Sequence, residues 1–344
     1  MKCNGAEIVV KTLVALNVDV IFGYPGGAVL PIYDAIFKQN RIRHVLVRHE
    51  QAAVHMAEGY ARSTGKVGVV LVTSGPGATN AVTGLTDAFM DSVPILCLTG
   101  QVPTHLIGTD AFQEADTVGI TSSCTKHNYL VKSVNELEET ILEAFYVAMS
   151  GRPGPVVVDL PKDVQNENFS YNFLKVSKPT SYQPVKRPKN LKIKELLEAI
   201  YNSKKPIIYS GGGVINSGGR ASSVLNELVN FLDIPVTNTL MGLGSIPASN
   251  KRFLGMLGMH GTYEANMAMY ECDLMICIGA RFDDRVTGKI ESFSPKSKKI
   301  HIDIDPSSIN KNIKVDYPVI GDAGIIMGML LKELRSTKRR INKS

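Results

Sequence analysis

The chain has 344 residues, of which 44% are hydrophobic, 20% charged and 7% aromatic, and this composition excludes bulk disorder. At roughly 100 to 200 residues per domain, the length predicts two domains. The formal net charge is +6, and much of the positive excess lies in residues 332–343, which argues against a general nucleic-acid-binding surface.

The five cysteines are an odd number and include no Cys-x-x-Cys pair, so neither a disulfide framework nor a zinc site is indicated. We expect reduced, mostly buried thiols. The N-terminal segment reaches Glu7 without the apolar stretch of a signal peptide, and no apolar run approaches the roughly 18 residues that a membrane span needs. We therefore expect a cytoplasmic protein with no membrane partner, with the plastid stroma or another reducing organelle as the alternative.

Short apolar strands alternate with amphipathic helices in residues 1–165. The predicted strands are 18–22, 44–47, 67–72, 95–99 and 156–160, and the predicted helices are 51–62, 79–90 and one that Asn4 begins. Continuous Val, Ile and Leu strands separated by helices are typical of a parallel sheet covered on both faces. The expected fold class is therefore α/β, with doubly wound parallel sheets.

A second α/β domain is predicted over residues 191–335. Its helices are expected at 193–201, 220–232 and 323–334, and its strands at 206–209, 235–236, 274–278 and 299–304. Residues 166–190 lose the apolar periodicity and contain several prolines, so they are predicted to be a linker. Residues 336–344 form a basic tail.

Glycine-rich or polar segments follow the first four predicted strands. They are residues 23–27, 48–50, 73–80 and 100–101. In open parallel sheets, ligands bind beyond the carboxyl ends of the strands, so these segments are expected to meet at one edge. Taken alone, the glycines could be needed only for the backbone conformation of the turns. Glu50 could likewise only interact favourably with the positive end of a helix dipole. Their coincidence predicts a ligand site that contains one carboxylate.

These segments resemble a known family. Residues 22–27, 48–53, 73–80 and 110–114 closely resemble the catalytic subunits of the acetolactate synthase (acetohydroxyacid synthase) family, and the likeness continues through 151–155, 159–162, 257–261 and 280–288. The resemblance implies a thiamine-diphosphate enzyme. Such an enzyme condenses two pyruvates, or pyruvate and 2-oxobutanoate, to 2-acetolactate or 2-aceto-2-hydroxybutanoate with release of CO2, the first step of valine, isoleucine and leucine biosynthesis.

The resemblance also implies roles for single residues. Glu50, Gln113, Lys162 and Arg285 match catalytic positions, and Phe112 and Met259 match substrate-lining positions. In the family, the residue that Glu50 matches hydrogen-bonds the aminopyrimidine ring of the cofactor, which favours the imino tautomer that takes the thiazolium proton. Tyr24, Pro25, Thr73, Pro76, Gly77 and Asn80 match positions around that ring.

Several of these residues have a plainer interpretation when the resemblance is set aside. Arg285 matches the arginine that holds the carboxylate of the second substrate, but without the resemblance it would more often be interpreted as a local ion pair with Asp283 or Asp284. His260 could be a structural histidine, and Lys162 could be a solvated lysine at a strand end.

The second domain is expected to bind FAD. Its segment 210–216 looks like a dinucleotide-binding loop, but Asn216 stands where the third glycine should be, which argues against a nicotinamide dehydrogenase. The resemblance assigns FAD contacts to Arg152, Gly211, Gly212, Gly213, Thr239, Leu240, Met241, Leu257, Gly258, Met259, His260, Gly279, Ala280, Arg281, Asp303, Ile304 and Asp305. Asp283 and Arg285 are expected to be further cofactor-binding residues. Asp303 and Asp305 could otherwise only cap the end of a strand.

The expected Mg²⁺ site is not found in this sequence. In the family, a Gly-Asp-Gly run and a later pair of asparagines in a third domain hold the magnesium diphosphate, and this chain contains no Gly-Asp-Gly. An excised fragment, a split gene product and a non-catalytic FAD-binding remnant therefore remain open. A glyoxylate carboligase is disfavoured by Glu50, and a pyruvate oxidase by residues 283–285. The resemblance implies three kinds of partner, which are 2-oxo acids, a second copy of the chain in a homodimer, and a small regulatory subunit.

Overall fold

The computed structural model describes residues 2–170, 182–188 and 191–337. They form two compact units, Met1–Gln183 and Pro184–Ser344, called unit 1 and unit 2 below. The border between the units falls within the predicted linker 166–190. Residues 171–181 and 189–190 of that linker lie outside the described residues, as do residues 338–344 of the predicted basic tail.

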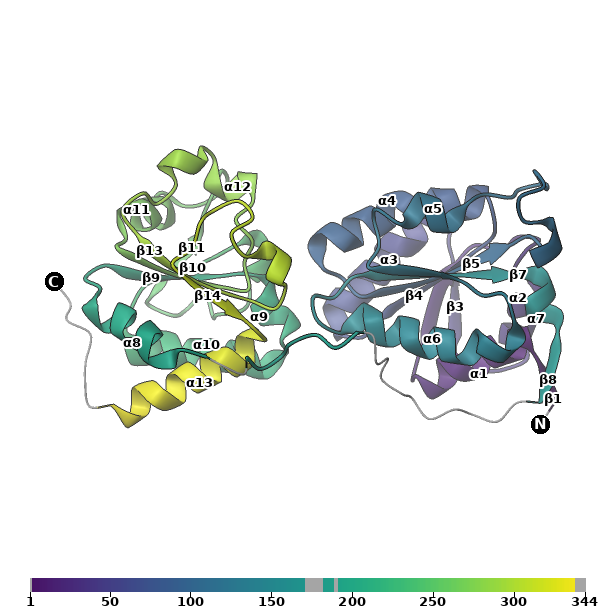
Figure 1. The fold of residues 1–344 in the computed structure, drawn as a ribbon, viewed down its shortest axis with the longest axis horizontal. Coiled ribbons are helices and arrows are strands. Elements are labelled where there is room, and N and C mark those ends of the chain that lie inside the picture. Colours follow the sequence, from purple (N-terminus) through teal and green to yellow (C-terminus); the bar gives the residue numbers. More distant parts are fainter. Residues whose placement is uncertain (1, 171–181, 189–190, 338–344) are drawn as a thin grey trace. The chain divides into compact units, whose positions relative to one another are not determined.

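Unit 1 is a six-stranded parallel sheet between two layers of helices (Figure 1). The strand order is β3-β2-β4-β5-β7-β6, with β2 Val20–Gly23, β3 Arg43–Leu46, β4 Gly68–Val72, β5 Ile95–Gln101, β6 His127–Leu130 and β7 Pro155–Pro161. Helices α1 Gly5–Ala15, α2 Leu30–Phe37 and α6 Val134–Met149 pack on one face, and α3 Glu50–Thr64 and α4 Pro76–Asp91 pack on the other.

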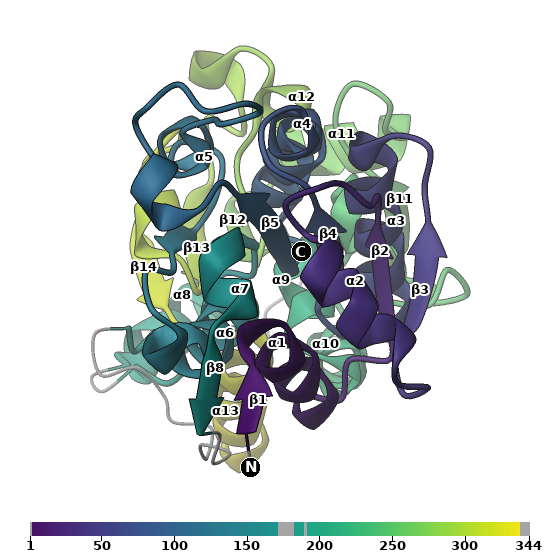
Figure 2. The ribbon, with the colours of Figure 1, turned by 90° about the vertical axis from the view of Figure 1, so that its right-hand side faces the viewer.

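Shorter elements complete unit 1. They are the 3-10 helix η1 Thr104–Leu106 and the helices α5 Thr117–Thr121 and α7 Lys162–Asn166. Strands β1 Lys2–Asn4 and β8 Asn168–Ser170 pair antiparallel and lie side by side in Figure 2. This pairing joins the N-terminal segment to the segment that follows α7.

The apolar strands of unit 1 are buried on both faces. In β4, Val69 and Leu71 belong to the core under α1 and α6, while Val70 and Val72 belong to the core under α3 and α4. Successive side chains of a strand point to opposite faces, so a strand covered on both sides needs an unbroken apolar run. The Val-Val-Leu-Val run of β4 has this pattern.

Unit 2 has the same layered arrangement. Its parallel strand order is β11-β10-β9-β12-β13-β14, with β9 Pro206–Ser210, β10 Val236–Asn238, β11 Phe253–Met256, β12 Leu274–Ile278, β13 Lys298–Asp303 and β14 Tyr317–Ile320. Helices α8 Ile193–Asn202, α10 Gly219–Leu232 and α13 Ala323–Ser336 cover one face, and α11 Tyr263–Glu271 packs on the other. Shorter elements are α9 Gly212–Asn216, α12 Asp284–Thr287, η2 Leu240–Gly242, η3 Ile290–Ser292 and η4 Pro306–Ser308.

The predicted fold class is confirmed, with two doubly wound parallel-sheet units. The predictions for single elements are less complete. They missed α2, α6, α11, β6, β11 and β14, and they placed the start of α4 at Thr79, whereas the helix begins at Pro76. Proline is tolerated in the first helical turn because its missing N–H has no partner within the helix there.

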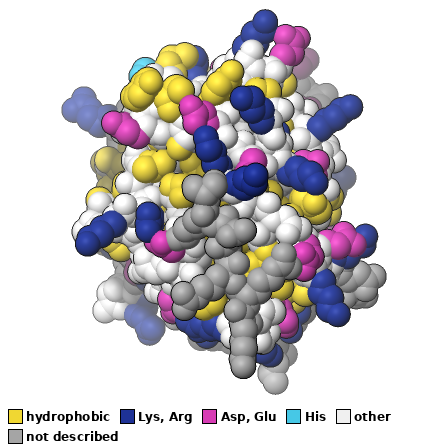
Figure 3. Space-filling view, turned by 90° about the vertical axis from the view of Figure 1, so that its left-hand side faces the viewer, with side chains coloured by type: hydrophobic (Ala, Val, Ile, Leu, Met, Phe, Trp, Pro, Cys, Tyr) yellow, Lys and Arg dark blue, Asp and Glu magenta, His cyan; other side chains and the backbone are white. Residues whose placement is uncertain are grey.

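The surface charges and the cysteine side chains both agree with the expectations from the composition. All five cysteines are free and buried, as predicted. Lys and Arg side chains are interspersed with Asp and Glu side chains on the face drawn in Figure 3. Among the helices of the described residues, none is long and apolar enough to cross a lipid bilayer.

A carboxyl group is buried inside unit 1. Asp159 of β7 accepts hydrogen bonds from Thr99 Oγ1 at 2.6 Å and from Gln101 Nε2 at 2.8 Å. Burial raises the pKa of Asp159 to about 7, against the opposing effect of these two hydrogen bonds. The folded chain therefore holds a proton on Asp159 at pH values where an ordinary aspartate has lost it.

Helices α3 and α4 pack so closely that one position admits no side chain. A Cβ built on Gly84 of α4 would lie 2.5 Å from Val54 Cβ of α3. Gly59 of α3, in contrast, has open space around its Cβ position. The two glycines thus differ in what an added methyl group would meet.

Gly84→Ala is expected to lower the free energy of unfolding by roughly 1–3 kcal/mol, because the methyl group overpacks the α3–α4 contact. Gly59→Ala is expected to raise it by about 0.5–1 kcal/mol, because alanine favours the helix and nothing obstructs it. Urea unfolding followed by circular dichroism measures both. Equal stabilities of the two variants would contradict the close contact.

The stability of unit 1 is expected to fall between about pH 4 and pH 7, because the folded state keeps the proton of Asp159 in this window and the unfolded state has lost it. This one group contributes a slope of at most about 1.4 kcal/mol per pH unit. Asp159→Asn does not titrate and should flatten the profile. Urea midpoints across this window measure the effect, and an equally steep decline in the variant would refute it.

Candidate functional site

A buried carboxylate stands at the carboxyl edge of the sheet in unit 1. Glu50 is the first residue of α3 and is 8% exposed, although glutamate is usually a surface residue. Asn80 Nδ2 in α4 donates a hydrogen bond to Glu50 Oε2 at 2.9 Å. Both helices begin at this edge, so they bring together two residues that were predicted to bind the cofactor.

Thr73 and Gly77 lie beside Glu50. A Cβ on Gly77 would lie 2.7 Å from Thr73 Cγ2 and 3.5 Å from Glu50 Oε1. A Cβ on Gly26 would also collide with the Thr73 side chain, whose Oγ1 accepts a hydrogen bond from the Ala28 N–H at 3.3 Å. The loops after β2 and β4 therefore close on Thr73, and the absence of a side chain at Gly77 keeps Glu50 Oε1 accessible.

Further predicted residues lie along the same edge. The Tyr24 N–H donates to the Leu71 carbonyl at 3.2 Å, which holds the exposed pair Tyr24 and Pro25 next to β4. Pro76 is the first residue of α4. Tyr33, which the sequence analysis missed, has its pKa raised by burial and by the charge of Glu50.

Gln113 and Phe112 lie on an exposed loop between η1 and α5. Gly75 and Gln113 both have positive φ, +54° and +58°, and a Cβ on Gly75 would lie only 2.5 Å from the Gln113 carbonyl oxygen. This contact ties the loop to the start of α4. Phe112 is 88% exposed, so its side chain is available to a ligand or a partner.

Lys162 lies at the carboxyl edge, and Arg152 does not. Lys162 is half-buried and begins α7, directly after β7. Arg152 precedes β7 and donates to Ser92 Oγ at 2.8 Å and to the Phe89 carbonyl at 3.2 Å, at the far end of α4. The structure therefore separates Arg152 from Glu50 and places it in a different unit from the other predicted FAD contacts.

The remaining predicted FAD contacts gather at the carboxyl edge of the sheet in unit 2. Residues 211–213 follow β9, 239–241 follow β10, 257–260 follow β11, 279–281 follow β12, and 303–305 end and follow β13. Five loops that are far apart in the sequence thus meet at one edge, because all six strands run parallel.

Glycines allow two of these loops to touch through their backbones. The Gly213 N–H donates to the Gly279 carbonyl at 2.8 Å, and a Cβ on Gly213 would lie 2.6 Å from Gly279 Cα. Gly279 has a φ of +59°, which favours glycine. The main chains of the two loops therefore lie in direct contact, at a place where larger residues would collide.

Arg285 and Asp283 come from the short helix α12. The Met259 N–H donates to the Arg285 carbonyl at 2.9 Å, so the loop after β11 contacts α12 through its backbone. Asp283 caps α12 by accepting from the Arg285 N–H at 2.9 Å. The Arg285 side chain is 71% exposed and lies 3.9 Å from the Asp284 carboxylate, so its guanidinium group faces solvent.

The loop after β13 is tied to the loop after β12 by a residue that the sequence analysis missed. His301 Nε2 lies 3.0 Å from the Ala280 carbonyl and 3.7 Å from Asp303 Oδ2. Asp303 Oδ1 accepts from the Asp305 N–H at 2.9 Å. Polar residues within the buried strand β13, among them Lys299 and His301, were the available signal, and Asp159 in β7 gave a similar one.

Two family descriptions match the chain. Residues 3–120 match the thiamine pyrophosphate enzyme N-terminal TPP binding domain, and residues 193–330 match the thiamine pyrophosphate enzyme central domain. The first match contains Glu50 and Asn80, and the second contains all five loops at the carboxyl edge of unit 2.

Curated relatives share about half of their matched residues with this chain. Identity is 54% over 324 residues with the acetolactate synthase large subunit of Haemophilus influenzae, covering 94% of this chain and 56% of the relative. It is 51% over 333 residues with the acetolactate synthase isozyme 3 large subunit of Escherichia coli, covering 96% and 58%. The chain thus spans just over half the length of these relatives. It belongs to the thiamine pyrophosphate enzymes, with their N-terminal TPP binding domain and central domain, and is similar to acetolactate synthase large subunits.

Proposed function

We propose that this chain forms the thiamine- and FAD-binding part of an acetolactate synthase catalytic subunit. The reaction joins two pyruvates, or pyruvate and 2-oxobutanoate, with release of CO2, the first step of branched-chain amino-acid biosynthesis. The observation that carries the proposal is the buried Glu50 carboxylate, held by Asn80 beside Gly77 at the carboxyl edge of unit 1. The names of the relatives favour this reaction over those of a glyoxylate carboligase or a pyruvate oxidase.

The residues around Glu50 suit the aminopyrimidine end of thiamine diphosphate. When bound, that cofactor supplies the carbon nucleophile that adds to the 2-oxo acid and accepts the electron pair released with CO2. Asn80 fixes Glu50 Oε2, so Oε1 is the oxygen that can share a proton with a ring nitrogen. Burial excludes water and strengthens this hydrogen bond.

Unit 2 supplies the proposed FAD site. The backbone surface of residues 211–213 and 279–281 lets an extended ligand approach main-chain N–H groups, which suits a diphosphate. Leu240 and Met259 add exposed apolar side chains beside it. FAD takes no net redox part in the proposed condensation. Arg152 stays a proposed FAD contact from unit 1.

The remaining partners are also proposals. Arg285 offers an exposed guanidinium group for a substrate carboxylate, and Phe112 and Met259 offer apolar contacts. Exposed apolar side chains near the Glu50 edge, such as Tyr24 and Leu30, favour a homodimer. Mg²⁺ is proposed to act with the cofactor diphosphate, outside the residues described above. A small regulatory subunit, which the family resemblance implies, is a further proposed partner.

Glu50→Gln is expected to abolish acetolactate formation, because an amide of nearly the same volume cannot exchange the shared proton. The test joins this chain to the part of the Haemophilus influenzae relative that the match leaves uncovered, and measures acetolactate made from pyruvate with thiamine diphosphate, Mg²⁺ and FAD. We expect a loss of at least about a hundredfold.

Glu139→Gln serves as the control, because Glu139 is an exposed carboxylate on α6 away from the Glu50 edge. It should leave turnover unchanged. Near-normal turnover of Glu50→Gln would refute the catalytic role of Glu50. An inactive parent protein that still binds FAD would instead support a non-catalytic FAD-binding remnant.

The full chain is expected to retain FAD, seen as flavin absorbance after desalting. Leu240→Asp should weaken FAD binding at least tenfold, because it places a charge in the proposed site beside an anionic ligand (~1.4 kcal/mol per tenfold). Leu243→Asp is the matched control, because Leu243 is exposed at the end of the same 3-10 helix and is not a proposed contact. A protein that stays colourless with added FAD would refute the assignment.

A further inference from the structure

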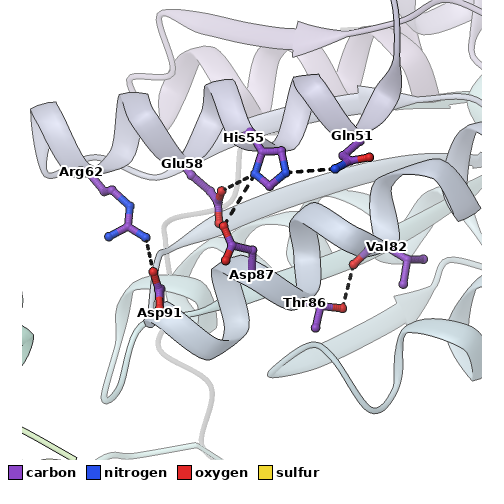
Figure 4. A network of polar contacts seen from close by, with 8 residues as sticks. All are labelled: Gln51, His55, Glu58, Arg62, Val82, Thr86, Asp87 and Asp91. Carbon is purple, nitrogen blue, oxygen red and sulfur yellow. Dashed lines mark hydrogen bonds and ion pairs between the residues drawn. The ribbon is translucent and has the colours of Figure 1, made fainter. Parts of the chain in front are cut away.

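Three titratable side chains converge between α3 and α4, away from Glu50. His55 and Glu58 lie one turn apart on α3, and Asp87 faces them from α4 (Figure 4). His55 Nδ1 lies 2.8 Å from Glu58 Oε2 and 3.7 Å from Asp87 Oδ2. One ligand atom from each residue lies within 4.8 Å of the others. The group forms a three-residue cluster, called the α3–α4 cluster below.

The spacing of the α3–α4 cluster suits a metal ion. Ligands about 2.0–2.1 Å from a tetrahedral Zn²⁺ are about 3.4 Å from one another. The observed separations of 2.8 and 3.7 Å fall on either side of this value. Asp87 is half exposed, so a small rotation of its side chain would equalise them.

Glu58 provides a second and independent observation. Its side chain is 6% exposed, and its Oε1 is buried without a hydrogen-bond partner, although Oε2 faces His55. A buried carboxylate oxygen without a partner costs free energy, and a second carboxylate beside it adds repulsion. A bound cation would satisfy this oxygen and offset both costs.

The geometry points to a divalent transition-metal site formed by His55, Glu58 and Asp87. One imidazole and two carboxylates suit Zn²⁺, Co²⁺ or Mn²⁺, whereas Mg²⁺ and Ca²⁺ prefer oxygen ligands alone. The Gln51 amide lies 3.4 Å from His55 Nε2, and its oxygen, turned toward the ring, would accept the Nε2 proton while Nδ1 binds the metal.

Such an ion would link the two helices that carry the Glu50–Asn80 pair. Glu50 begins α3 five residues before His55, and Asn80 lies on α4 seven residues before Asp87. A metal bond between the helices constrains their spacing more strongly than the exposed Arg62–Asp91 ion pair farther along the same seam. The metal therefore acts on the position of Glu50 without touching a substrate.

The experiment titrates the metal-free full chain with Co²⁺ and then with Zn²⁺, following the visible Co²⁺ bands and the thermal midpoint. We expect one saturable site, bands of nitrogen and oxygen ligation without thiolate charge transfer, displacement by Zn²⁺ and a raised thermal midpoint. His55→Gln and Asp87→Asn, both at exposed positions, should each weaken binding at least about tenfold.

Asp91→Asn is the matched control, because Asp91 is the neighbouring carboxylate of α4 but lies outside the α3–α4 cluster. Its metal affinity should stay within about twofold of the parent chain, a change of ~0.4 kcal/mol. Absence of saturable binding, or parent-like binding by both His55→Gln and Asp87→Asn, would overturn the assignment. Since the readout is metal binding and not turnover, it is independent of the proposed acetolactate synthase activity.

Discussion

The constraint on which both units depend is parallel strand pairing. In each six-stranded sheet all strands point the same way, so every loop that follows one of these strands reaches the same edge. In unit 1 this brings Glu50, which follows β3, together with Thr73 and Asn80, which both follow β4. In unit 2 it gathers five loops, from residue 211 to residue 305. Apolar burial on both faces stabilises the strands, and the polar and glycine-rich loops follow the strands at the edges.

The parts of the fold that were predictable are those whose local pattern has one physical explanation. A strand buried on both faces must be continuously apolar, and residues 68–72 and 274–278 are. The missed strands β6 and β14 lie at the borders of their sheets, where they are only partly buried and need no such run. Helix α6 was missed despite a readable capping box of Ser133 and Glu136.

The candidate site shows the same division. The loops and Glu50 could be predicted because strand ends and family motifs mark them in the sequence. The partners of Glu50 in space, the pKa of Asp159 and the α3–α4 cluster could not, because each depends on side chains that meet only in the folded chain. His55 and Asp87 belong to different helices, and no spacing rule connects them.

The position of Glu50 lets a buried carboxylate be stabilised by the fold and still offer one oxygen to a ligand. Burying a carboxylate is costly unless it is hydrogen-bonded, and Asn80 satisfies one of its oxygens. As the first residue of α3, Glu50 also lies where the helix dipole favours negative charge. These two interactions stabilise the buried carboxylate and leave Oε1 to accept a hydrogen bond from a ligand. A fully satisfied carboxylate would be more stable but would have no oxygen left for a ligand. The packing of α3 on α4 therefore determines how firmly that free oxygen is held, which makes the seam between these helices part of the site.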